Sequence, residues 1–392
     1  MAANNRIYYP VQQVAFRKPK SGAGSGASAA REAHGVQSIG ITTTFNLEQA
    51  FELGQLAIYE NIEGIPSVEV TMSKVLDGYP LLWCLATSTD KLGADLTGPS
   101  LAKRAPAECG VQLGIWPETQ EGVSGVPPLF VEMSGMAVNS FGYNFPLDDN
   151  FSEDITLAGN NKLWSTYNNK DALGQTCNAS WATSGVSGNF QDNNDAPIGS
   201  GGVNRRENMF FANTLAKSAD ADYTILPADI FGVSNSGVKS GIVHVASISV
   251  STDLAREEVF ELGARSPYYK AVTFPIEVTC DIEVTSISGD LVNALDDCGN
   301  AALCATPDNL ADRKIRIATC EGTRIYLGEK NKLASVSYGG GDAGGGNVTV
   351  TYSYTTFNDF TVLHSGDDFN AQGQTWWAAR KNYLGALTQG AV

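Results

Sequence analysis

Histidines, the side chains most often used as metal ligands and general bases, are few in this chain and far apart. His34, His244 and His364 are the three histidines, and more than a hundred residues separate each from the next. Metal-binding histidines usually lie a few residues apart, so this spacing favours isolated surface or strand residues. The sequence also contains no GxSxG, HExxH or GxxxxGK[ST] motif, and no dinucleotide-binding glycine pattern after a strand. We therefore expect no enzyme, no metal and no cofactor.

Adjacent carboxylates are the other candidates for chemistry. They occur as Asp148–Asp149, Glu153–Asp154 and Asp367–Asp368. Such pairs can bind calcium or act as acid and base, but no D-x-[DN]-x-[DN]-G loop surrounds them. We interpret them as solvated acidic residues in turns.

Cysteine usage and the start of the chain bear on the compartment. The chain has seven cysteines, an odd number, and none forms a CxxC motif. They are Cys84, Cys109, Cys177, Cys280, Cys298, Cys304 and Cys320. Reduced thiols in a cytoplasm are the simplest interpretation. The first residues, MAANNRIYYPVQQ, lack the apolar core of a signal peptide, and no run of about 18 apolar residues occurs, so we expect no membrane span.

Composition indicates the fold class and limits the kinds of partner. Hydrophobic residues make up 43% and charged residues 17% of the 392 residues, a balance typical of a globular chain. The 41 glycines and 15 prolines indicate many turns between short strands, so we predict a mainly β, α+β protein. A net charge of -16 argues against a protein that grips nucleic acid by neutralising phosphates, although such charge can also serve solubility alone.

An internal repeat is the most informative feature of the sequence. Residues 36–66 align without a gap on residues 245–275, and after Ser67 is skipped VEVT at 68–71 falls on IEVT at 276–279. The alignment gives 14 identities in 35 pairs, where unrelated sequences give about two. Two copies of one supersecondary unit are therefore predicted.

Each copy reads as a strand, a short amphipathic helix and a second strand. Asn46 with Gln49, and Asp253 in the second copy, are expected to cap the helices. The motif FELG would end each helix at a glycine that tolerates the left-handed conformation, and a proline would start the next strand. The predicted anchors of this unit are Phe51, Leu53, Gly54, Pro66, Phe260, Leu262, Gly263 and Pro275. With the two phenylalanines and two leucines seating the helices, Phe260→Ala is expected to cost about 3–5 kcal/mol.

Five segments follow from these patterns. We predict a basic flexible arm at 1–34, a first module at 35–165, a connector or insertion at 166–240, a second module at 241–364 and a docking tail with Trp376 and Trp377 at 365–392. The strand-like stretches 129–145 and 332–357 would be the closing hairpins of the two modules, with the glycine run 339–346 at a hairpin tip. The arm is either without a role or lies on the acidic surface of a neighbouring subunit. Its basic residues are Arg6, Arg17, Lys18, Lys20 and Arg31.

Several motifs resemble the tail tube proteins of tailed bacteriophages. They are VASISVSTDLAREEVFELGARSPYYKAVTFPIEVTCDIEV at 245–284, YNFPLDDNFSEDITLAGNNKLW at 143–164 and GGVNRRENM at 201–209. The resemblance covers about two thirds of the chain and is carried by structural motifs. It implies two tandem β-sandwich or half-barrel modules, each with one short flanking helix, whose long strands line a lumen when rings assemble.

The resemblance also implies a function and partners. The chain would be a structural protein of the virion tail, made in the cytoplasm of a bacterial host. Its rings, trimeric with pseudo-six-fold symmetry or else hexameric, would stack into a tube beside other tail proteins. DNA would pass through an acidic lumen without specific binding. The alternatives are a baseplate hub or tail-end ring that does not polymerise, and a receptor-binding or carbohydrate-binding surface protein; an enzyme is a third and weaker alternative.

Overall fold

The fold was analysed in a computed structural model. It describes residues 12–17, 31–54, 58–87, 101–116, 129–166, 202–209, 244–264, 267–286, 312–319, 323–339 and 346–363, together with residues 7, 56 and 292.

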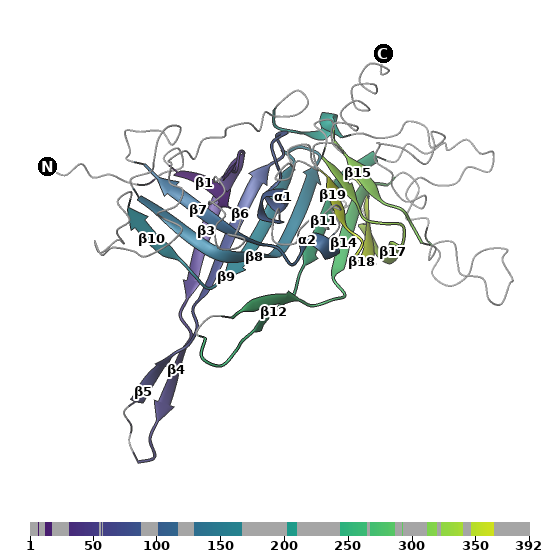
Figure 1. Ribbon diagram of the computed structural model, residues 1–392. Coiled ribbons are helices and arrows are strands. Elements are labelled where there is room, and N and C mark those ends of the chain that lie inside the picture. Colours follow the sequence, from purple (N-terminus) through teal and green to yellow (C-terminus); the bar gives the residue numbers. More distant parts are fainter. Residues whose placement is uncertain are drawn as a thin grey trace, which may run out of the picture.

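Eight antiparallel strands form the central sheet of the molecule (Figure 1). Their spatial order is β3 (Val36–Thr44), β6 (Ser67–Val75), β9 (Ser152–Gly159), β8 (Leu129–Pro146), β11 (His244–Asp253), β14 (Glu277–Thr285), β18 (Thr349–Phe357) and β17 (Lys332–Gly339). We call β3, β6, β9 and β8 the first unit, and β11, β14, β18 and β17 the second unit. The prediction of a mainly β fold is confirmed.

Strand β8 is long enough to belong to two sheets. Its second half, from Ala137, pairs with β9 and β11. Its first half pairs with β10 (Leu163–Thr166) and β7 (Glu108–Ile115), and β7 continues through β1 (Gln12–Arg17) to β2 (Arg31–Glu32). Gly135, with φ +65°, lies between the halves, where a left-handed residue lets the strand change direction.

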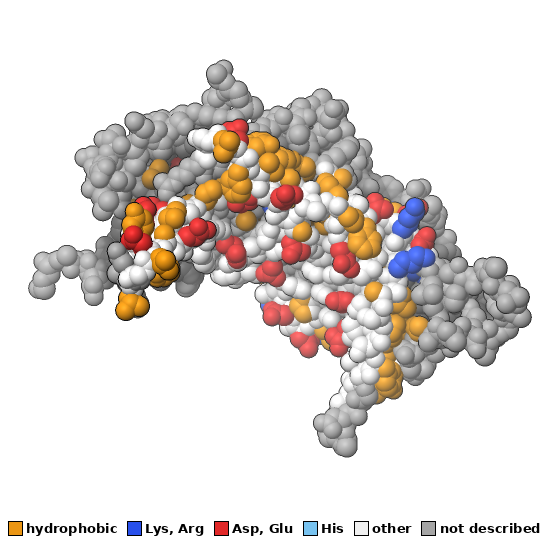
Figure 2. Space-filling model, turned by 90° about the horizontal axis from the view of Figure 1, so that it is seen from below, with side chains coloured by type: hydrophobic (Ala, Val, Ile, Leu, Met, Phe, Trp, Pro, Cys, Tyr) orange, Lys and Arg blue, Asp and Glu red, His pale blue; other side chains and the backbone are white. Residues whose placement is uncertain are grey.

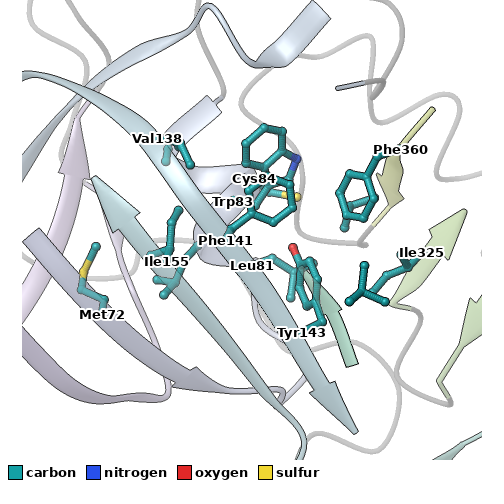
Figure 3. Packing of buried hydrophobic residues seen from close by; sticks show 14 of the residues in the cluster. Met72, Leu81, Trp83, Cys84, Val138, Phe141, Tyr143, Ile155, Ile325 and Phe360 are labelled. Carbon is teal, nitrogen blue, oxygen red and sulfur yellow. The ribbon is translucent and has the colours of Figure 1, made fainter. Parts of the chain in front are cut away.

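One face of the eight strands is covered. The cover consists of helices α1 (Leu82–Thr87) and α2 (Leu101–Arg104) and a small sheet of β15 (Arg316–Ala318), β16 (Arg324–Tyr326) and β19 (Thr361–Leu363), with the short 3-10 turn η3 (Arg206–Asn208) nearby. In the core, Phe141 of β8 lies 4.3 Å from Trp83 of α1 and 5.1 Å from Phe360, measured between ring centroids (Figure 3). Burial of these rings holds the cover on the sheet.

The other face of the eight strands is open, and period-two alternation explains the difference. In β6, Val68, Val70 and Met72 are buried, while Glu69 and Thr71 between them are exposed. The same alternation runs through β9, β14 and β18. A strand turns successive side chains to opposite faces, so one sequence supplies both a core and a polar surface.

The two repeated stretches adopt the same series of elements: a strand, a hairpin and a second strand. The pairing register differs from the sequence alignment by two residues. Thr43 lies opposite Val68, whereas its counterpart Thr252 lies opposite Val278 and not opposite Ile276. A shift of two keeps every side chain on its face, so the core pattern is preserved.

Irregularities of pairing also recur at matching positions of the two units. A bulge follows Val36 in β3, and another follows its aligned counterpart Val245 in β11. A bulge follows Val138 where β8 pairs with β9, and another follows Leu333 where β17 pairs with β18. Strand for strand, β3 thus corresponds to β11, β6 to β14, β9 to β18 and β8 to β17.

The predicted helices in the repeat are wrong. Residues 47–63 form a hairpin of β4 (Leu47–Phe51) and β5 (Ile58–Glu63), and the second copy forms β12 (Arg256–Val259) and β13 (Tyr269–Val272). Asn46 caps no helix; its side-chain amide donates to the Ile65 carbonyl and its own carbonyl accepts from the Gly64 N–H, which closes the hairpin base. So short a helix needs a surface to pack on, and the extended arms instead obtain their hydrogen bonds from each other.

The predicted anchors therefore have other roles. Phe51 is 66%, Leu53 103%, Phe260 51% and Leu262 105% exposed, so none seats a helix on the sheet. Gly54 and Gly263 adopt φ of +92° and +90° at the hairpin turns. The left-handed conformation was predicted, but it serves a turn and not a helix end. Pro66 lies directly before β6, and Pro275 lies two residues before β14.

The flexible basic arm is wrong for the part that the structure describes. Residues 12–17 form strand β1, and the Arg17 side chain is buried. Arg31 begins β2. Arg6, Lys18 and Lys20 lie outside the described residues. So do the proposed tail at 365–392 and most of the connector, of which 202–209 are described.

Candidate assembly surface

The open face of the eight strands carries small polar side chains and carboxylates. Its acidic residues are Glu69, Asp154, Asp253, Glu277, Asp281 and Glu283. Among the described residues of these strands, the Lys or Arg on this face is Lys332, at the end of β17, and its ammonium lies 2.9 Å from the Asp312 carboxylate. Figure 2 shows Asp and Glu spread over the underside of the molecule, with Lys and Arg gathered at one side. The face is therefore negative, with neutral Ser, Thr and Gly between the charges.

A direct strand pairing joins the two units. The second half of β8 runs antiparallel to β11, with Tyr143 opposite Val250 and Gly142 opposite Ser251. Tyr143 and Val250 are both buried, so the joint is part of the core and continues both faces of the sheet from one unit into the next. Gly142 permits this approach, because a Cβ there would lie 3.3 Å from the Val250 carbonyl oxygen.

The outer edges of the sheet are β3 and β17. Among the described residues, β3 pairs with β6 and β17 with β18, and neither has a partner on its other side. The inward side chains at these edges are incompletely covered: Ile39, Ile41, Leu333 and Val336 are partly buried, and Tyr338 is 53% exposed. An exposed edge with unpaired backbone groups is a template for another strand.

The two hairpins differ in their surroundings. Figure 1 shows β4 and β5 extending away from the body, whereas β12 lies close beneath it. The β4–β5 hairpin exposes apolar side chains along its length: Phe45, Leu47, Phe51, Leu53, Leu56, Ile58, Tyr59 and Ile62. Clustered apolar exposure of this kind marks an interaction surface.

Glu153 corrects the interpretation of the acidic pairs as solvated. Its carboxylate is buried and accepts hydrogen bonds from the backbone N–H groups of Leu82 (2.6 Å) and Trp83 (2.9 Å) and from the Tyr143 hydroxyl (2.9 Å). Burial raises the pKa of Glu153 to about 7, opposed by these hydrogen bonds and by Lys74. Period-two spacing could have revealed it, since Glu153, Ile155 and Leu157 share one face of β9. Glu153 therefore fixes the start of α1 on the sheet.

A second buried carboxylate lies in the smaller sheet. Burial raises the pKa of Glu132 to about 7, and Arg17 opposes this shift. Burial in turn lowers the pKa of Arg17. Both residues belong to neighbouring parts of the β1–β7–β8 sheet, so they serve its core and not the open face.

The described histidines and cysteines, the remaining candidates for chemistry, lie apart from one another. His34 stacks on Tyr79, with ring centroids 4.1 Å apart, and His244 begins β11. Cys84, Cys109 and Cys280 are buried thiols, and burial raises the pKa of Cys109 to about 12. In the described ranges no three His, Cys, Asp or Glu side chains group as metal ligands, and no helix is long and apolar enough to cross a membrane.

Comparison with known proteins finds similarity among solved structures. No protein-family model matches the sequence, and no curated protein matches it. Among solved structures, the chain is similar to the anti-feeding prophage cap (AFP tube terminating cap). The match has 13% sequence identity and a TM-score of 0.28, and it covers 42% of this chain and 95% of that chain.

Proposed function

We propose that this chain is a structural subunit of a phage-type tail, in which copies join edge to edge into a ring around a channel. The pairing of β8 with β11 inside one chain carries the proposal. The free edges are β17, the counterpart of β8, and β3, the counterpart of β11. A joint of the same kind between β17 of one copy and β3 of the next is heterologous and repeats head to tail.

The internal joint predicts the register of the joint between copies. Tyr143 corresponds to Tyr338, because each follows the bulge of its strand by the same number of residues. Val250 corresponds to Ile41 in the repeat. Tyr338 of one copy should then lie opposite Ile41 of the next, with both side chains turned to the core side.

Closure follows from the geometry of a twisted sheet. Each chain supplies two four-stranded units to a continuous antiparallel sheet, so a trimer contains six units and a pseudo-six-fold axis, with a hexamer as the larger alternative. Closing the ring removes the exposed edges that a single chain leaves. Rings stacked along the axis, beside other tail proteins in the virion, would form a tube.

The open face suits the wall of a channel for DNA. Carboxylates among hydroxyl side chains repel the phosphate backbone and offer it few groups to bind. At an ionic strength of about 0.15 M the Debye length is about 8 Å, so repulsion acts near the wall and lets DNA slide. The role is architectural: we propose no catalysis, no cofactor and no specific DNA binding.

Cysteine cross-linking tests the edge joint. Thr42 and Ser337 are expected to lie opposite each other on the open face, as Ser251 and Gly142 do within the chain. Thr42→Cys and Ser337→Cys are made on separate chains, in a background with Cys177, Cys298, Cys304 and Cys320 replaced by Ser, then mixed and treated with a short bismaleimide. Covalent heterodimers in mixtures of the two variants, with neither variant linking alone, support the proposal. Mixtures that stay monomeric contradict it.

Negative-stain microscopy of the purified protein then separates tube from single ring. Long hollow tubes indicate stacking, as in a tail tube. Isolated rings indicate a hub or tail-end ring that closes once.

A further inference from the structure

The β12–β13 hairpin is held against the first unit of its own chain. Arg256 donates from Nε to the Val138 carbonyl and from Nη2 to the Ala105 carbonyl, each at 2.5 Å. Lys270, which is 7% exposed, donates to the Ala158 carbonyl at 3.3 Å. At the hairpin base, Leu254 is fully buried.

The β4–β5 hairpin occupies the corresponding place in the first copy of the repeat, but the described side chains at its base are exposed. Phe45 aligns with Leu254 in the repeat and is 70% exposed. Leu47 aligns with Arg256 and is 61% exposed. The position that is buried in one copy of the repeat is thus apolar and uncovered in the other.

The receiving surface also has a counterpart. Ala158, near the end of β9, and Asn160, just after this strand, meet the β12–β13 hairpin, where Asn160 donates to Glu258 at 3.2 Å. Pairing with β6 and β14 places Gly159 opposite Val68 and Thr356 opposite Val278, so Asn160 corresponds to Phe357 at the end of β18. Phe357 is 55% exposed. In the second unit, the aromatic side chain of Phe357 thus stands where Asn160 makes its hydrogen bond to Glu258 in the first unit.

We infer that the β4–β5 hairpin docks on the second unit of the next copy, with Phe45 buried at the hairpin base, Leu47 beside Leu333 and Gln49 beside Phe357. The inference rests on the proposed function, because the β17–β3 joint brings these residues together. A second copy is the occupant because its β17–β18 end reproduces the surface on which β12–β13 already lies. Apolar packing then does between chains what Arg256 and Lys270 do within one chain.

Charge placed in this contact tests the inference. Phe45→Asp should leave the monomer folded, because Phe45 is exposed, and should lower the yield of Thr42–Ser337 cross-links by about tenfold or more, as expected of a buried anchor at an interface. Leu53→Asp, on the same hairpin but at its tip, is the matched control and should leave the yield unchanged. The thermal unfolding midpoint of each variant, measured before mixing, shows that folding is intact.

A second pair of cysteines separates this inference from the ring itself. Gln49→Cys and Phe357→Cys on separate chains, in the background described above, should cross-link when mixed, because their counterparts Glu258 and Asn160 are in contact within the chain. Efficient Thr42–Ser337 linkage without Gln49–Phe357 linkage, and with no effect of Phe45→Asp, overturns the docking and leaves the ring intact. Failure of Thr42–Ser337 linkage in the unsubstituted hairpin background overturns the ring.

Discussion

At the residue scale, Glu153 links stability to pH. Its folded-state pKa of about 7 is raised from 4.5, so the folded protein binds a proton that the unfolded chain releases between these values. The stability gained from this proton is fully present below pH 4.5 and is lost as pH rises toward 7. Glu132 acts in the same direction over the same window.

Glu153→Gln should flatten this dependence, because a neutral amide does not titrate. Its one oxygen can still accept from the Trp83 N–H and the Tyr143 hydroxyl, whereas the Leu82 N–H loses its acceptor. The free energy of unfolding, measured by urea denaturation between pH 4.5 and 7.5, should fall less steeply with rising pH than in the unaltered protein. Glu132→Gln in the same background should flatten it further. A Glu153→Gln variant with the original slope would show that this carboxylate is ionised throughout.

Two phenylalanines, one buried and one exposed, should differ in their contribution to stability. Phe141 is 4% exposed and packs on Trp83 and Phe360, so Phe141→Ala should destabilise the chain by about 3–5 kcal/mol. Phe260 is 51% exposed, and Phe260→Ala should cost less than about 1 kcal/mol, contrary to the prediction from sequence. Thermal or urea unfolding of both variants makes the comparison. Equal losses would place Phe260 in the core after all.

At the element scale, the sequence predicted those strands whose two faces differ. Alternation in β6, β14 and β18 and turn residues around the β17–β18 hairpin were enough, because each strand has one buried and one open face. The hairpins were missed because the spacing of the apolar residues at 47–53 was interpreted as the buried face of a helix. In a single chain these residues are exposed and pack on no core, so their spacing does not indicate a helix. The pairing of β8 with β11 leaves no local signal, since it joins residues about a hundred positions apart.

The hairpin bases give a prediction for the single chain. Leu254 and Phe45 are counterparts in the repeat, but Leu254 is fully buried and Phe45 is 70% exposed. Leu254→Ala should cost about 2–5 kcal/mol of monomer stability, and Phe45→Ala should change it by about 0.5 kcal/mol or less. Denaturant unfolding at a concentration below assembly measures both. A large loss for Phe45→Ala in the monomer would mean that the hairpin folds back onto its own chain.

At the scale of the whole molecule, one chain already contains a working example of the joint it would make with its neighbours. The sheet is complete in the middle, where β8 meets β11, and open at both ends. The exposed base of the β4–β5 hairpin belongs to the same asymmetry, since Leu254 at the base of β12–β13 is buried, whereas its counterpart Phe45 is exposed. On the proposed assembly, the chain would gain its last contacts when the ring closes.

The charge of the open face predicts how the assembly treats DNA. Glu69, Glu277 and Asp281 project from β6 and β14 onto this face, and changing all three to Lys replaces repulsion of phosphates by attraction. Assembled particles of this variant should retain duplex DNA at low salt and release it as salt rises, whereas unaltered particles should retain none. The matched control carries Glu48→Lys, Glu60→Lys and Glu63→Lys on the β4–β5 hairpin, which makes the same change of charge away from the sheet. Filter binding across a salt series gives the measurement. If the hairpin variant holds DNA as strongly as the sheet variant, the open face does not line the path of the DNA.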